Sequence, residues 1–250
     1  MPEQEPLAVS RTVARVGVVG RGRLGSSLAP ALADAGYTVT GPTGRGDRIA
    51  DADVVLLCVP DRQIRDAAAA AAGHARFIGH TSGATGLDDV DFGLHPLQTF
   101  TGGDDPSVFA GIGAAIGGRT PEALATARSL ATALGMRPFE IDDADRAGYH
   151  AAAAFASNFL LTLEGVAERV LRSAVPGAQG ADARGLLAPL VRRTVENWAA
   201  AGAASALTGP IARGDDDTVA RQRAAIDADL VPLFDMLAAH TGALAAERSL

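Results

Sequence analysis

The sequence predicts an α/β fold in which a doubly wound parallel sheet is followed by an all-helical C-terminal domain. Three observations lead to this prediction. In the first half, short β-branched runs alternate with Ala- and Leu-rich segments of helical periodicity. One of these runs, "DVVLLCVP" at 53–60, is continuously apolar, as in a parallel strand covered on both faces. From about Asp142 the helical periodicity continues without strand-like runs.

The first half gives strands and helices in alternation. "RVGVVG" begins a strand, and the following helix ends at a C-terminal glycine. We expect strands at 15–20, 37–41, 53–60, 76–83, 111–118 and 136–141, and helices at 23–36, 61–73 and 121–135.

The second half reads as helices only. One long helix is expected to about residue 174, and a second at 181–204 with a possible kink at Pro189. The stretch 216–247 is either two helices or one helix bent at Pro232. We therefore expect domains at residues 1–141 and 142–250.

Composition excludes several classes of protein. All 22 basic residues are arginine, so a Schiff-base lysine and a P-loop lysine are excluded. A net charge of −7 with scattered arginines argues against nucleic-acid and membrane partners. The single cysteine, Cys58, lies in an apolar run that suggests a buried strand. With no signal-peptide pattern in "MPEQEPLAVS" and no bilayer-length apolar stretch, we expect a cytoplasmic protein.

A glycine loop joins the first strand to the first helix. Its spacing is Gly20-x-Gly22-x-x-Gly25. In such loops the first glycine permits a tight turn, the second lets a pyrophosphate approach the backbone, and the third allows close packing of helix and strand. The free N–H groups of the helix N-terminus then face the phosphates. The first domain is thus predicted to be a Rossmann-like dinucleotide-binding domain.

The end of the second strand indicates which dinucleotide is bound. An NAD site usually has an acid about 20 residues after the loop, bonded to the ribose 2′-hydroxyl. Here Thr40, Thr43 and Arg45 stand at that position, and a hydroxyl with a guanidinium suits a 2′-phosphate. Asp47 comes later and would have to be returned by a long loop. NADP is favoured, with NAD as the alternative.

Six ordered motifs carry a family resemblance over nearly the whole chain: "GRGRLGSSLA", "VPDRQI", "HTSGA", "GLHPLQTF", "HAAAAFASNFL" and "LTGPIARGD". Together they resemble a group of bacterial proteins of unknown function with a Rossmann-like domain and a helical domain. That group is similar to 6-phosphogluconate dehydrogenase, pyrroline-5-carboxylate reductase, prephenate dehydrogenase and ketopantoate reductase. The resemblance implies an NAD(P)-dependent oxidoreductase, often dimeric, with its active site between the domains.

Several residues are assigned to the cofactor from these motifs. To the three loop glycines, Thr43 and Arg45 we add Arg23 and Leu24 at the helix start, Val59 and Pro60 of "VPDRQI", and Ser82 of "HTSGA". The resemblance also has a departure. Several relatives use a lysine at the start of the first long C-terminal helix, with an asparagine further along. This chain has Asn158 but no lysine, and His150 is the nearest polar residue upstream.

Hydride transfer to a carbonyl needs a proton or a hydrogen-bond donor for the forming alkoxide. Histidine suits this role because it titrates near neutral pH. His150 and Ser157 are seven apart and share a helix face, with Ala154 between them and Asn158 alongside. His150 and Asn158 are therefore predicted to be catalytic and Ser157 to contact substrate; alternatively, these are polar groups satisfied against the sheet.

His95 precedes a proline in "HPLQTF". Pro96 restricts His95 to an extended conformation, which sets the direction of its imidazole near the carboxyl edge of the sheet, where ligands of open sheets bind. The motif resembles the His-Pro segment of prephenate dehydrogenases, in which the histidine faces the substrate. We predict that His95 binds substrate and assists catalysis; the alternative is a structural turn.

"LTGPIARGDDD" joins two predicted helices. Arg213 could pair with a substrate carboxylate or with a surface acid, and Asp215 to Asp217 are expected to cap the next helix. No metal-ligand spacing is found.

The prediction is thus an NADP-dependent oxidoreductase acting on a small anionic carbonyl or imino acid, and assembled as a homodimer. By analogy a ketopantoate-like 2-keto acid is the first guess. The alternatives are a pyrroline-5-carboxylate-type imine, or a regulatory dinucleotide-binding protein without turnover.

Overall fold

The structure is a computed structural model that describes residues 13–175, 177 and 181–247. The chain forms two compact units, residues 1–158 and 159–250, and each is described by itself. The expected domain boundary after residue 141 lies earlier than this division. The start of the first helix after the sheet contacts the sheet through Arg146.

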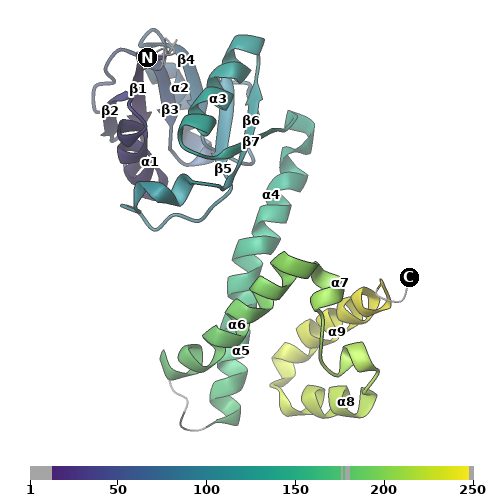
Figure 1. Ribbon diagram of the computed structural model, residues 1–250. Helices are drawn as coiled ribbons and strands as arrows, with labels where there is room; N and C mark the ends of the chain where they lie inside the picture. The colour runs from purple at the N-terminus through teal and green to yellow at the C-terminus, as the bar shows by residue number, and fades with distance from the viewer. Residues whose placement is uncertain (1–12, 176, 178–180, 248–250) are drawn as a thin grey trace, which may run out of the picture. The chain divides into compact units, whose positions relative to one another are not determined.

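Within the described residues of the first unit, seven strands form one sheet in the order β2-β1-β3-β4-β5-β6-β7 (Figure 1). Neighbouring strands run parallel except β5 and β6, which are antiparallel. The predicted doubly wound α/β fold is confirmed. The strands are β1 (Arg15–Val19), β2 (Thr38–Thr43), β3 (Ala52–Leu57), β4 (Ala75–His80), β5 (Phe92–Pro96), β6 (Gly113–Gly118) and β7 (Arg137–Glu140).

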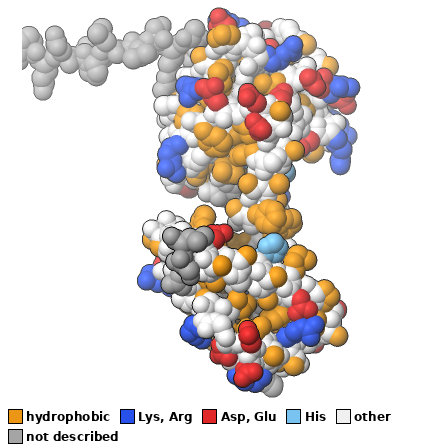
Figure 2. Space-filling view, turned by 90° about the vertical axis from the view of Figure 1, so that its right-hand side faces the viewer, with side chains coloured by type: hydrophobic (Ala, Val, Ile, Leu, Met, Phe, Trp, Pro, Cys, Tyr) orange, Lys and Arg blue, Asp and Glu red, His pale blue; other side chains and the backbone are white. Residues whose placement is uncertain are grey.

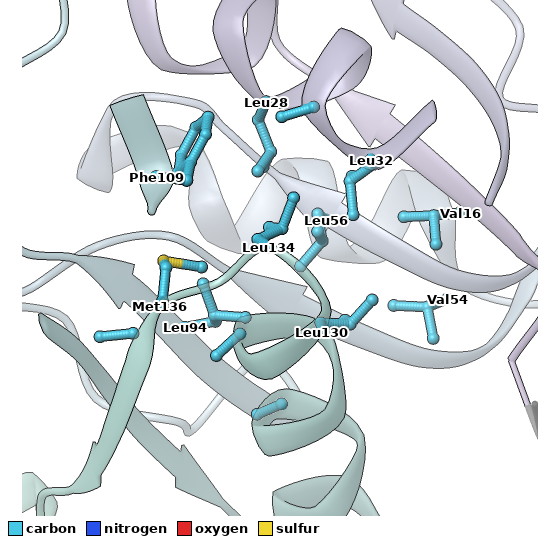
Figure 3. Close-up of a cluster of buried hydrophobic side chains, with 14 of the residues drawn as sticks. Val16, Leu28, Leu32, Val54, Leu56, Leu94, Phe109, Leu130, Leu134 and Met136 are labelled. Carbon is cyan, nitrogen blue, oxygen red and sulfur yellow. The ribbon is translucent and has the colours of Figure 1, made fainter. Parts of the chain in front are cut away.

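The apolar strands are covered by helices on both faces. Helices α1 (Arg23–Asp34) and α3 (Pro121–Ala133) pack on one face, and α2 (Ile64–Ala71) packs on the other. The alternation of strand side chains explains this. In β3, Val54 and Leu56 belong to the core shared with α1 and α3, which Figure 3 shows, while Val55 and Leu57 belong to the core shared with α2.

Strand β5 was not predicted, although it contains the first two residues of "HPLQTF". Leu94 points into the core shared with α1 and α3, so its neighbours Gly93 and His95 face the opposite side of the sheet. The first turn of helix α4 (Arg146–Ala154) lies against that side, because its Arg146 contacts Gly93 and Gly117.

A π-helical turn, Phe155–Phe159, continues α4 into α5 (Leu160–Ala174), and the division between the two units falls within this turn. One long helix was predicted here, and the chain is helical throughout. The π turn itself left no pattern in the sequence.

The second unit consists of helices in its described part. After α5 come α6 (Ala181–Ala201), with Pro189 in its interior, and the short α7 (Ala203–Ala206). Helices α8 (Asp216–Ala225) and α9 (Val231–Ala246) follow, and Pro232 lies in the first turn of α9. The stretch 216–247 is therefore two helices. Arg169 of α5 pairs with Asp227 and Asp229, at 2.6 Å from each.

In the part of the chain that the structure describes, no helix is long and apolar enough to cross a membrane. The N-terminal segment "MPEQEPLAVS", on which the expectation about a signal peptide depends, lies outside the described residues.

Candidate functional site

The glycine loop has the geometry that dinucleotide binding requires. Gly20 has φ +115°, and a Cβ there would lie 2.1 Å from the Cys58 carbonyl oxygen. A Cβ on Gly25 would lie 1.9 Å from the Gly20 carbonyl oxygen, so α1 can approach β1 only if this residue is glycine. At Gly22, by contrast, a Cβ would meet nothing within 4 Å. No contact within the fold explains a glycine at position 22, whereas a backbone left open for a ligand does explain it.

The N-terminus of α1 begins at this open position. Gly22 is its N-cap residue, and no side chain caps the helix. The first N–H groups of α1 are therefore not engaged by a capping side chain and can bind an anion. Gly22 and the helix start together fit a pyrophosphate.

A pocket of about 740 Å³ extends from the glycine loop along the carboxyl ends of β1, β2 and β3. Its lining includes six of the predicted cofactor residues, Gly20, Gly22, Thr43, Arg45, Val59 and Pro60. Arg23, Leu24 and Gly25 form the first turn of α1 next to it. Ser82 lies elsewhere: its hydroxyl contacts Thr85 at 3.1 Å and accepts from the N–H groups of Ala84 and Thr85. Ser82 therefore orders its own loop.

The rim of the pocket at the end of β2 carries charge. The loop after Thr43 does return Asp47, which lines the pocket with Arg45. The Asp47 carboxylate is already engaged, since it accepts from the Gly44 N–H at 2.8 Å and pairs with Arg21. Arg45 is exposed and makes no ion pair with any described residue.

Cys58 also lines this pocket, at the end of β3. Burial raises the pKa of its thiol to about 12, and a contact with Thr81 partly opposes the shift. The thiol is therefore protonated at neutral pH and is not an activated nucleophile.

A second cluster of polar side chains joins β5, α4 and the loop after β4. Nδ1 of His95 lies 2.6 Å from Oη of Tyr149, and the rings of His95 and His150 are 6.4 Å apart. Gly83 of "HTSGA" lies against both histidines: a Cβ there would be 2.9 Å from His95 and 3.1 Å from His150. Three sequence motifs thus meet in one place. Tyr149 was missed in the sequence, where its position next to His150 was the only available signal.

This cluster lies at the same edge of the sheet as the pocket. β5 runs parallel to β4, and β4 is parallel to β3, so the carboxyl end of β5 that carries His95 is on the side where β1 and β3 end. Ligands of open α/β sheets bind at this edge.

The surroundings determine the protonation of the cluster. Burial, together with the nearby His150, Arg146 and His80, lowers the pKa of His95 to about 4, against an opposing effect of Asp61. Burial raises the pKa of Tyr149 to about 12, against an opposing effect of Arg146. At neutral pH His95 is thus a neutral imidazole and Tyr149 a neutral phenol. The physical cause of the low pKa of His95 is desolvation of the imidazolium form.

Arg146, one helical turn before Tyr149 and His150, is buried against the same face of the sheet. Its Nε donates to the Asp143 carboxylate at 2.6 Å, and that carboxylate also accepts from the Leu87 N–H. Nη1 and Nη2 are buried without a hydrogen-bond partner in the structure. Burying a charge without hydrogen-bond partners costs free energy, which the ion pair with Asp143 offsets only in part.

The remaining predicted residues lie at or beyond the end of α4. Ser157 is half-buried and Asn158 is exposed, both within the π turn. A π turn takes up about one residue more than an α turn, which moves Ser157 off the row of His150 and brings Asn158 toward it. Arg213 is exposed in the second unit. As predicted, Asp215 caps α8, accepting from the Thr218 N–H at 3.1 Å.

These features define a class: a Rossmann-like dinucleotide-binding fold followed by a helical C-terminal region. Residues 112–241 match the family described as a domain of unknown function, DUF2520, and the chain belongs to that family. No curated protein matches the sequence.

Similar solved structures have low sequence identity. A Bacteroides fragilis protein assigned as an NADP oxidoreductase is 20% identical, with a TM-score of 0.75 over 92% of this chain and 98% of that chain. Protein TM1727 from Thermotoga maritima is 21% identical, with a TM-score of 0.76 over 94% and 100%. The NADP-bound pyrroline carboxylate reductase of Plasmodium falciparum is 10% identical, with a TM-score of 0.53 over 94% and 98%. These likenesses support the fold.

Proposed function

We propose that this protein is an NADP-dependent oxidoreductase acting on a small carbonyl or imino acid. One observation carries the proposal: a dinucleotide-type glycine loop with an open pocket shares a sheet edge with the His95–Tyr149–His150 cluster. The likeness of the fold to an assigned NADP oxidoreductase and to a pyrroline carboxylate reductase agrees with it.

When bound, NADPH supplies the hydride that reduces the substrate's carbonyl or imine carbon. The electron pair of that double bond moves to the oxygen or nitrogen, which takes up one proton. His150 is proposed to deliver this proton, and neutral His95 to donate a hydrogen bond to the same atom. Gly22 and the start of α1 hold the pyrophosphate, and Asn158 orients the substrate.

The charged residues at the end of β2 favour NADP over NAD as the cofactor. A 2′-phosphate needs an unpaired cation, and Arg45 on the pocket rim has no acidic partner among the described residues. An NAD ribose would need a free carboxylate, and that of Asp47 is held by Arg21 and the Gly44 N–H.

For the substrate, a ketopantoate-like 2-keto acid is proposed first and a cyclic imino acid second. In either case Ser157 and Arg213 are proposed to contact the substrate, with Arg213 binding its carboxylate. The second candidate function is a regulatory dinucleotide-binding protein. It is favoured by one observation, the absence of any lysine at the position where related enzymes use one.

We also propose a homodimer formed through the helical unit. Among its described residues, only Ala183 and Leu230 are buried hydrophobics, a small core for a unit of this length. Figure 2 shows hydrophobic side chains, in orange, on the surface of this unit. The large exposed ones are Phe159, Leu161, Val175, Leu186, Leu190, Val195, Trp198, Met236 and Leu237. A second copy would bury such a surface.

The proposed activity is tested by following NADPH oxidation against a panel of 2-keto acids and cyclic imines. Turnover of one class identifies the enzyme and its substrate type. Tight NADPH binding by calorimetry, with no turnover across the panel, would support the regulatory protein instead.

A further inference from the structure

Tyr149 occupies a position that the proposed reaction does not by itself require. Its hydroxyl lies 2.6 Å from Nδ1 of His95, a short hydrogen bond in a half-buried environment. Its ring packs edge-on against Phe139 of β7, with centroids 5.9 Å apart, and against His95 at 5.5 Å. The phenol is therefore held in place from both sides.

The protonation of both groups leaves two directions for this hydrogen bond, and each direction corresponds to one tautomer of His95. A neutral imidazole has one nitrogen that donates and one that accepts. Tyr149 is a phenol at neutral pH and so carries a hydrogen to donate. Among the described residues His95 is the one hydrogen-bond partner of Tyr149 Oη. If Oη–H donates to Nδ1, the hydrogen of the imidazole must be on Nε2.

Nε2 is also the nitrogen left for a ligand. It makes no hydrogen bond with any described residue, and it is not among the buried polar atoms that lack partners. Solvent can therefore reach it. Gly83 covers the other side of the ring, where a Cβ would lie 2.9 Å from Cε1 and 3.0 Å from Nδ1.

We propose that Tyr149 is a positioning residue that holds His95 as the Nε2–H tautomer, so that His95 presents a neutral hydrogen-bond donor to the reacting oxygen or nitrogen of the substrate. The donor role rests on the proposed function, whereas the tautomer does not. A neutral donor stabilises a forming alkoxide without taking up or releasing a proton, which leaves proton delivery to His150.

The charged and titratable groups around His95 agree with this role. The positively charged form of His95 is disfavoured by Arg146 and His150 of α4 and by His80 of β4. Asp61, before α2, has the opposite effect. His95 therefore stays neutral around neutral pH. Tyr149 then determines which of its two nitrogens carries the hydrogen.

The test is nitrogen NMR of the five histidine side chains in the full-length protein, with His95 identified from a His95→Gln variant. The wild type should show one His95 tautomer, hydrogen on Nε2, that does not titrate between about pH 6 and 8. Tyr149→Phe keeps the ring that packs on Phe139 and removes only the hydroxyl. It should give a mixture of tautomers, with NADPH affinity unchanged.

The matched control is Tyr37→Phe, since Tyr37 is the chain's other tyrosine and lies in the core near α1. It should leave the His95 signal as in the wild type. Hydrogen on Nδ1 in the wild type, or an unchanged tautomer in a folded Tyr149→Phe protein, would overturn the inference.

Turnover is measured separately on the same variants. For an active substrate, Tyr149→Phe should lower kcat by roughly tenfold with little change in the Kd for NADPH. Suppose that His95 shows the expected tautomer but no substrate is turned over. That result would support the role of Tyr149 in holding His95, and it would contradict only the proposed function.

Discussion

Gly93 and Gly117 lie directly opposite each other in the antiparallel β5–β6 pair, and the guanidinium of Arg146 lies over both. A Cβ on Gly93 would come within 3.1 Å of Nη2, and one on Gly117 within 2.9 Å. Two glycines in register thus make room for one buried side chain. Because Tyr149 and His150 follow Arg146 by three and four residues, seating Arg146 sets the face that α4 turns toward His95.

The first prediction is that Gly117→Ala lowers the free energy of unfolding by about 1–3 kcal/mol, the usual cost of overpacking. The new methyl group would also approach the Ile141 carbonyl oxygen, at 3.2 Å, so a shift of Arg146 would leave this backbone contact in place. Urea denaturation measures the effect. The control is Gly148→Ala in α4, where a Cβ meets nothing within 4 Å and stability should rise by up to about 1 kcal/mol. A Gly117→Ala protein as stable as the wild type would contradict this packing.

The second prediction concerns pH. The pKa of His95 in the folded state is near 4, below the ordinary 6.5, so His95 binds a proton less readily in the folded than in the unfolded state. Unfolding then takes up protons between these values, and stability falls as the pH drops from about 6.5 to about 4. The loss attributable to His95 is at most about 3 kcal/mol.

His95→Gln should flatten this pH dependence, measured as the free energy of unfolding in urea from pH 7 to pH 4. Replacing His240, an exposed histidine on α9, by glutamine should leave the slope unchanged. An identical slope in His95→Gln and the wild type would mean that His95 is not desolvated as the structure indicates.

How far the sequence could anticipate this site depends on how local each feature is. The glycine loop was predictable because its spacing lies between a strand and a helix, where Gly20 and Gly25 have steric reasons and Gly22 leaves the backbone open. Strand β5 was not, since five residues that include Gly93 and Pro96 give no strand pattern and pair with a distant strand. The contact between His95 and Tyr149 joins residues 54 apart and depends on that strand.

The third prediction is that NADPH binds at least about tenfold more tightly than NADH, a difference of about 1.4 kcal/mol. Arg45→Ala should remove most of this preference because Arg45 is the unpaired cation on the pocket rim. Calorimetry with both cofactors gives the measurement. Arg48→Ala is the control, since Arg48 is exposed and does not line the pocket. Equal or tighter NADH binding in the wild type would assign the site to NAD.

The fourth prediction is a homodimer at micromolar concentration, measured by light scattering. Leu190 is 65% exposed and Trp198 56% exposed, two turns apart on α6. Replacing Leu190 by Glu should shift the protein toward monomer because a charge in an apolar interface is strongly unfavourable. Ala125→Glu, on the exposed side of α3, adds the same charge to the first unit and should not change the mass. A monomeric wild type would contradict the proposal.

The last prediction separates the two histidines by their effects on kinetics. His150 is proposed to deliver the proton, so His150→Ala should lower kcat by about 10²–10⁴-fold, the usual contribution of a general acid. The Kd for NADPH should hardly change, since the phosphates are proposed to bind at Gly22 and the start of α1. His95 has a pKa near 4 and is proposed to donate a hydrogen bond at neutral pH, so His95→Ala should raise KM and lower kcat by at least the roughly tenfold expected for Tyr149→Phe, a smaller loss than in His150→Ala.

The pH profiles distinguish them further. A fall of kcat with rising pH that His150→Ala removes and His95→Ala retains would assign proton delivery to His150. Near-normal turnover in both variants, with weaker NADPH binding or a lower Tm, would instead make both histidines structural. The contact between β5 and α4 would then serve to hold the helix on the sheet, and the reacting groups would have to be sought elsewhere in the chain.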